Sequence, residues 1–271
     1  MYNYSNLDRL SSNMTAFTLL ALDSRGYEIS DDALWNRETL IERLLTYQNP
    51  DNGGFGLSDS GTVSIDITAM TLQALAPYNN SQYPQVQAAV EKALTYLQDQ
   101  MRNDCGYWAE GADNGCSAAQ VLTALVSLGI DPLDPDSGFT RGSNNLVAKL
   151  DDFRLENGFT TFGGRNTPDG MATSQIAYAL EAYRRFVNGE NSIYDLTDVG
   201  EKSQEEIDQA AAQEVMDLID AIGTVTADGG EAIQSARKAY DSLTDAQKEL
   251  VSNYDVLLAA EEAFALLGGN N

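Results

Sequence analysis

Gln48-Asn49-Pro50-Asp51-Asn52-Gly53-Gly54-Phe55 ends in a Gly-aromatic pair that returns twice along the chain. The pairs Gly106-Tyr107 and Gly158-Phe159 follow at steps of 52 residues. Around them lie apolar segments that share small residues at their start and an Ala-Leu pair further on, and these segments begin at Thr15, Thr68, Ala118 and Thr173. A fixed period of about 50 residues is typical of repeat proteins, in which each unit buries its apolar face against the next. The sequence therefore predicts stacked repeats.

Two kinds of helical segment alternate along the first 187 residues. Segments 14–22 and 118–128 are almost wholly apolar or small, which is typical of a helix buried on all sides. Segments 37–47 and 86–97 carry apolar residues on one face and charged residues on the other, and 144–155 repeats this pattern more weakly. We therefore expect an all-α fold with four inner and three outer helices, paired and joined by Gly-rich loops.

The composition changes after this repeat region. Residues 187–203 form a polar connector, and 204–267 are rich in Ala, Glu, Asp and Gln. Within the latter, Thr244 and Gln247 have the spacing of a capping box. The sequence predicts a repeat domain of about 3.5 helix pairs over 1–195, followed by a small antiparallel bundle of three or four helices over 203–267.

The charge of the chain excludes several classes of partner. The formal net charge is −25 over 271 residues. Nucleic-acid binding needs a basic surface that displaces counterions from phosphates, so we expect no nucleic-acid partner. No run of about 18 apolar residues occurs, so we expect no membrane insertion. The first eight residues form a polar stretch where an earlier Gly-aromatic loop would lie, and we expect a fragment of a larger multidomain protein whose signal peptide is missing.

The chain has two cysteines, Cys105 and Cys116, and no histidine. They are eleven positions apart, in a stretch that contains Gly, Asn and Asp, which allows a disulfide. Two buried thiols are the alternative, and both remain open at this point. A bridge would place the protein outside the cytosol. With this ligand set we expect no metal site and no cofactor.

The Gly-aromatic loops also resemble a known repeat. Residues 48–55 and 92–108 are similar to the Gln-Trp repeat of squalene-hopene cyclases, within the α/α-toroid superfamily of terpenoid cyclases and protein prenyltransferases. The third copy, Asn157-Gly158-Phe159, keeps only the Gly-aromatic core. The resemblance covers about residues 5–187 and implies a partial toroid of inner and outer helices. The superfamily also contains non-catalytic cobalamin carriers, and its zinc-dependent prenyltransferases use a histidine that this chain lacks.

The resemblance directs attention to the starts of the inner helices. Class II cyclases carry Asp-x-Asp-Asp-Thr-Ala there, and the matching stretch is Ser64-Ile65-Asp66-Ile67-Thr68-Ala69. Asp66 aligns with the central acid, but Ser64 and Ile67 replace the flanking acids. A lone carboxyl lacks the neighbours that tune a strong acid, so Asp66 is interpreted as a helix cap, a ligand contact or a proton donor. The expected ligand-binding rim consists of Asn13, Asp66, Asn114, Ser117, Asp169 and Thr173.

The C-terminal segments 215–223, 239–248 and 253–257 resemble a helical module of large surface proteins of Gram-positive bacteria. This resemblance implies an extracellular or cell-wall-associated location. The resulting hypothesis is a non-enzymatic domain that binds a small molecule or a surface ligand, or acts in adhesion. The alternatives are a terpenoid-cyclase-type enzyme with Asp66 as its catalytic acid, a binding protein like the cobalamin carriers, and a pure scaffold.

Overall fold

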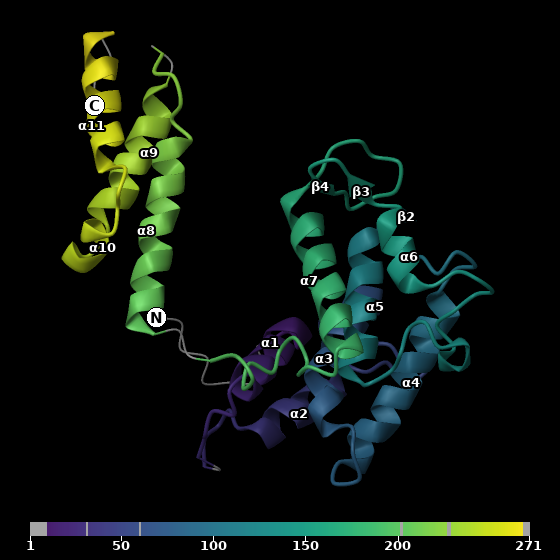
Figure 1. The fold of residues 1–271 in the computed structure, drawn as a ribbon. Coiled ribbons are helices and arrows are strands. Elements are labelled where there is room, and N and C mark those ends of the chain that lie inside the picture. The colour runs from purple at the N-terminus through teal and green to yellow at the C-terminus, as the bar shows by residue number, and fades with distance from the viewer. Residues whose placement is uncertain (1–9, 31, 60, 201–202, 227–228, 268–271) are drawn as a thin grey trace. The chain divides into compact units, whose positions relative to one another are not determined.

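The computed structural model describes residues 10–30, 32–59, 61–200, 203–226 and 229–267. The initial polar stretch lies outside these residues. The chain divides into two compact units, Met1–Val199 and Gly200–Asn271, and the division falls within the connector expected from the sequence. Figure 1 draws the helices and strands of each unit as a ribbon.

The described part of the first unit is mainly helical. Four helices pack side by side in chain order and form a row: α1 (Ser12–Asp23), α3 (Ile65–Leu75), α5 (Gly115–Ser127) and α7 (Gly170–Val187). Three further helices pack against α1, α3 and α5 respectively, and these are α2 (Arg37–Thr46), α4 (Pro84–Gln100) and α6 (Leu146–Asp151). Two 3₁₀ turns, η2 (Ala76–Tyr78) and η3 (Pro135–Ser137), complete its helical elements. Helix α5 is buried along nearly its whole length, because it lies between α3 and α7 and is covered by α6.

Polar side chains fix where three of the row helices begin. The Ser64 hydroxyl accepts from the N–H of Ile67 at 3.5 Å, and the Asn114 side chain accepts from Cys116 and Ser117. The Asp169 carboxylate caps α7 in the same way. These bonds satisfy amide groups that have no partner inside the helix.

The Gly-aromatic pairs form the returns between a covering helix and the next row helix. Phe55 and Tyr107 are completely buried, and Phe159 is nearly so. Their backbones pair with the chain leaving the preceding helix, Phe55 with Gln48 and Tyr107 with Met101. The repeated motif therefore has a structural role, placing an aromatic ring in the core at each return.

Two short hairpins correct the all-α expectation. One pairs β1 (Trp108–Ala109) with β2 (Ala112–Asp113), and the other pairs β3 (Arg154–Leu155) with β4 (Gly158–Phe159). The second hairpin also ends α6 at Asp151, so the helix predicted over 144–155 is shorter than expected. The reason is that backbone groups in these returns need hydrogen-bond partners, which a short ladder supplies.

Glutamine side chains also link the helix pairs near the first two returns. Gln48 Nε2 donates to the carbonyls of Gly53 and Ala89, and Ala89 belongs to α4, so this side chain ties one helix pair to the next. Near the second return, Gln98 of α4 donates to the carbonyl of Ser137.

The second unit consists of α8 (Gln204–Asp220), α9 (Gly230–Asp241), α10 (Asp245–Glu249) and α11 (Tyr254–Leu266) in its described part. Helices α8, α9 and α11 pack on one another, and α10 packs on α8. The predicted capping box at Thr244 and Gln247 is confirmed. The core is apolar and consists of Ala212, Val215, Ile219, Ile233, Ala236, Val251, Leu257, Ala260 and Phe264.

Membrane crossing requires a long apolar helix, and none of the helices in the described ranges has that combination of length and hydropathy.

Candidate functional site

Asp66 is the second residue of α3, and its environment differs from that of a helix cap. The cap is Ser64, so the interpretation of Asp66 as the capping residue is wrong. Ser64 takes that place because its short hydroxyl reaches the N–H of Ile67, whereas Asp66 already lies inside the first turn. The carboxyl group is instead enclosed between α3 and α5.

The Asp66 carboxyl group lies in a poorly solvated and incompletely paired environment. Burial raises its pKa, the nearby Ser117 hydroxyl of α5 acts in the opposite direction, and the charge of Glu110 raises the pKa further. Among the described residues neither Asp66 Oδ1 nor Ser117 Oγ has a partner within hydrogen-bonding geometry. The Ser117 hydroxyl is close enough to lower the pKa of Asp66, but the two groups do not meet in good hydrogen-bonding geometry. A bound group could complete the hydrogen bonds of both buried atoms.

Cys116 lies beside this pair, in the first turn of α5. Burial raises its pKa to about 11; its Sγ lies 3.9 Å from the Thr161 hydroxyl oxygen, and this contact acts in the opposite direction. The charges of Asp169, Asp66 and Glu110 also raise its pKa, which places all three carboxylates near this thiol. The structure thus gathers Asp66, Ser117 and Asp169 of the expected rim around the start of α5.

The other expected rim residues have local roles. Asn114 is buried, and its side-chain oxygen caps α5. The Thr173 hydroxyl accepts from the N–H of Phe159 at 3.0 Å, as the Thr68 hydroxyl does from Phe55 at 2.8 Å. Asn13 accepts hydrogen bonds from Ser11 and from the N–H of Met14 within its own helix.

Asp169 is also engaged within the protein. Its Oδ2 accepts from both the N–H and the hydroxyl of Thr161, and its Oδ1 accepts from Ala172. The Thr161 hydroxyl is the main reason that the pKa of Asp169 is lowered, and the Ala172 N–H adds to it. This carboxylate therefore contributes negative charge to the rim while its hydrogen-bonding capacity serves the fold.

The two cysteines are separate buried thiols in the structure. Cys105 lies in the turn after α4, with a positive φ of 62°, whereas Cys116 faces Thr161. The disulfide considered from the sequence is thus not formed, and the alternative of two thiols is the arrangement found. Burial raises the pKa of the Cys105 thiol, which keeps it in its unreactive form.

Comparisons with protein-family models and with curated proteins give no match for this sequence. Among the described residues, no group of three or more Cys, Asp or Glu side chains is arranged to hold a metal ion.

A buried ladder of amides crosses the row of helices and was not expected from the sequence. Gln73 Nε2 of α3 donates to Gln120 Oε1 at 2.9 Å, and Gln120 Nε2 of α5 donates to Gln175 Oε1 of α7 at 3.3 Å. The Tyr194 hydroxyl, from the chain after α7, donates to Gln73 Oε1 at 2.9 Å. The available signal was the presence of Gln73 and Gln120 within otherwise apolar or small segments, since a buried amide needs partners.

Lys149 of α6 forms a second unexpected polar cluster. Its side chain is only 4% exposed, and its Nζ lies 2.7 Å from Asp113 Oδ2 and 3.0 Å from carboxylate oxygens of both Asp104 and Asp152. Burial lowers the pKa of Lys149, but the three carboxylates outweigh this and raise it above its usual value. The cluster joins the return around Tyr107 to α6, so it holds the scaffold rather than the rim.

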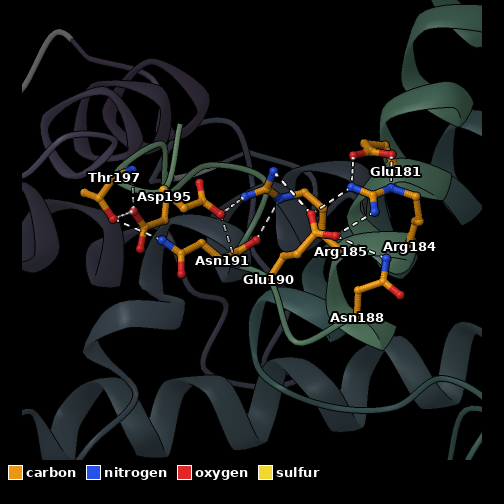
Figure 2. Close-up of polar contacts among 9 residues, drawn as sticks. Glu181, Arg184, Arg185, Asn188, Glu190, Asn191, Asp195 and Thr197 are labelled. Atoms are coloured by element: carbon orange, nitrogen blue, oxygen red, sulfur yellow. Dashed lines mark hydrogen bonds and ion pairs between the residues drawn. The ribbon is translucent and has the colours of Figure 1, made fainter. Parts of the chain in front are cut away.

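The chain that follows α7 is fastened to that helix by an ionic network. Figure 2 shows Arg184 bonded to Glu181 and Glu190, and Arg185 reaching toward the same connector. Arg185 Nε donates to the carbonyl of Asn191 at 2.8 Å, and its Nη2 bonds to Asp198. The Leu196 N–H donates to the carbonyl of Ser24 at the end of α1. This connector segment, residues 188–199, therefore runs back from α7 to α1.

Proposed function

We propose that the first unit is a non-enzymatic ligand-binding domain of the α/α-toroid kind, carried with its helical module in an exported bacterial surface protein. The observation that carries this proposal is the pair of buried, unpartnered atoms Asp66 Oδ1 and Ser117 Oγ at the start of the helix row. A ligand with a hydrogen-bond donor would satisfy both atoms at once. The order of packing along the row, with one covering helix for each of α1, α3 and α5, supports the toroid assignment.

Exposed apolar side chains in the first turns of two other row helices support an amphipathic ligand. Met14 and Met171 lie in the first turns of α1 and α7 and are 41% and 58% exposed. Flexible thioether side chains adapt to irregular apolar surfaces. A small molecule or a surface group with one polar end and an apolar body fits both features, and adhesion to such a group is the same chemistry on a larger partner.

The first turn of α3 argues against retained cyclase chemistry. Ser64 uses its hydroxyl to cap the helix, and Ile67 has no acidic group, so Asp66 lacks the neighbouring acids that the resemblance requires. The alternative of a terpenoid-cyclase-type enzyme is nevertheless favoured by one observation. Burial raises the pKa of Asp66, and a general acid must keep its proton near neutral pH. The hypothesis of a binding protein like the cobalamin carriers is supported only by the resemblance of the repeats.

The test compares binding with turnover in the same variants. Purified protein is screened by thermal shift against a panel of amphipathic metabolites, and hits are titrated with Asp66→Asn and Ser117→Ala. Glu42→Gln, which removes one exposed carboxylate from α2, is the matched control. The proposal expects ligand-induced stabilisation that both rim variants reduce and the control retains.

A parallel assay addresses the enzyme alternative. Wild-type protein is incubated with squalene and with oxidosqualene, and products are identified by mass spectrometry. The proposal expects no cyclised product. If the wild type forms product and Asp66→Asn abolishes this turnover, the cyclase assignment replaces the binding-domain proposal. If no ligand shifts the melting temperature, the scaffold hypothesis replaces it.

A further inference from the structure

A cavity of about 300 Å³ lies at the opposite end of the row helices from Asp66. Its walls come from the last turns of α1, α3 and α5, through Leu20, Gln73 and Ser127. The connector segment closes another side with Ser192, Tyr194 and Asp195. Four pieces of chain that are distant in sequence therefore meet around one partly open cavity.

The polar groups of this cavity are held in place before any ligand arrives. Gln73 is 2% exposed, and Tyr194 is bonded to it as part of the amide ladder. Asp195 accepts from both the N–H and the hydroxyl of Thr197. Preorganised groups bind with less loss of conformational freedom than mobile ones.

One polar atom in the wall has no partner. The hydroxyl oxygen of Ser127 is buried and makes no hydrogen bond with any described residue. Ser127 and Ser192 also line a smaller cavity of about 160 Å³. A buried hydroxyl without a partner is an unused recognition group.

The charge of the lining favours a cation. Asp23 and Asp195 both line the cavity, whereas no Lys or Arg is among its described lining residues. Asp23 forms an ion pair with Arg37 at 2.7 Å and accepts from the Tyr78 hydroxyl. Asp195 forms no ion pair among the described residues, although the Thr197 hydroxyl and, more weakly, the charge of Arg185 lower its pKa. Leu20, Pro77 and the Tyr194 ring supply apolar and aromatic surface beside these carboxylates. An ammonium group gains from both a carboxylate and an aromatic face.

We propose that this cavity, named here the connector cavity, is a second ligand site that takes a small organic amine with a short apolar or aromatic body. The ammonium group lies between Asp195 and the Ser127 hydroxyl, whose oxygen accepts a hydrogen bond from one of its N–H groups. The apolar body lies against Leu20 and Pro77. The site is independent of the rim at Asp66, because it uses the other ends of α1 and α3.

The ionic network of the connector segment anchors one wall of the connector cavity. Arg185 holds the carbonyl of Asn191 and the carboxylate of Asp198, on the two sides of the residues that line the cavity (Figure 2). The segment between these two anchors contains Ser192, Tyr194 and Asp195. Binding of the amine therefore depends on an anchored wall rather than on a free loop.

The test uses benzylamine as the probe and benzyl alcohol as its neutral counterpart of equal size. Binding to the full chain is followed by amide chemical-shift changes in two-dimensional NMR at 150 mM salt. We expect saturable shifts localised to residues 190–196 and to the end of α3 with benzylamine, and binding of the alcohol that is at least about tenfold weaker.

Two substitutions and a control complete the experiment. Asp195→Asn and Ser127→Ala should each weaken benzylamine, with a loss of about tenfold for the charge change, while Glu42→Gln should leave its affinity unchanged. Thermal melts establish that each variant folds. Equal binding of the amine and the alcohol, shifts scattered over the acidic surface, or equal weakening by Glu42→Gln would each overturn the proposal. Because Asp66→Asn leaves the connector cavity intact, loss of rim binding and loss of amine binding are separable outcomes.

Discussion

Replacing Lys149 by methionine removes the cation that Asp104, Asp113 and Asp152 share. The methionine keeps most of the volume, so the main effect is electrostatic. Removing one partner of a buried ion pair costs about 3–5 kcal/mol. The carboxylates are 23–64% exposed, so water compensates part of the loss and the lower end of that range, about 3 kcal/mol, applies.

Calorimetry of the full chain measures this effect with an internal reference. For a unit of nearly 200 residues, a loss of about 3 kcal/mol lowers Tm by roughly 6–12 °C. The transition of the second unit should not move, because its core contains none of these residues. Lys92→Met, at an exposed position of α4, is the matched control and should change stability by about 0.5 kcal/mol or less.

The pH dependence provides an independent check. Burial raises the pKa of Asp104, but hydrogen bonds from Lys149 and from the Gly106 N–H outweigh it and leave the pKa lowered. A carboxyl group whose pKa is lowered on folding contributes stability above its unfolded pKa and loses that contribution as the pH falls through its folded value. The stability difference between wild type and Lys149→Met should therefore narrow below about pH 4. A loss smaller than about 1 kcal/mol, or one that is constant with pH, would refute the reasoning.

Three further outcomes follow from the structure. Asp66→Asn should stabilise the first unit increasingly as the pH rises above about 4, because the folded wild type loses stability when a carboxyl group with a raised folded pKa ionises. Denaturant melts from pH 4 to 7 measure this, and a stability difference that does not change with pH would contradict it. Gln120→Leu should lower the stability of the first unit by about 1–3 kcal/mol, since it leaves amides of the ladder unpaired, and an unchanged unfolding midpoint would contradict this. Arg237→Met removes a bidentate pair with Glu261 at 2.6 and 2.7 Å and should destabilise only the second unit, by about 1–2 kcal/mol in differential calorimetry, so movement of the other transition would count against it.

The sequence predicted the elements whose signals are local. The apolar segment 118–128 corresponds to α5, the most buried of the described helices. The segment 86–97, with one apolar and one charged face, corresponds to α4. The capping box at Thr244 was readable because both partners lie within four residues. Hydrophobic periodicity and capping are properties of a single segment, so they can be identified without knowing which other segments pack against it.

The candidate site was predictable only in part. Asp66 was identified through a motif, but its polar neighbour Ser117 is 51 residues away in the chain. The ladder of Gln73 and Gln120 and the connector cavity arise from contacts between different helices. A single sequence gives no direct signal for such contacts, since an isolated polar residue in an apolar segment does not reveal its partner.

The amide ladder gives the row of helices a direction. Gln73 and Gln120 each present the carbonyl oxygen to the preceding donor and the NH₂ group to the following acceptor, in a series that runs from Tyr194 to Gln175. Reversing the Gln120 amide would oppose two donors at its junction with Gln73 and two acceptors at its junction with Gln175. Neighbouring helix pairs are therefore not interchangeable, although their loops repeat. Exchanging two of them would retain every Gly-aromatic return and still break the ladder, so the polar interior records the order of the repeats.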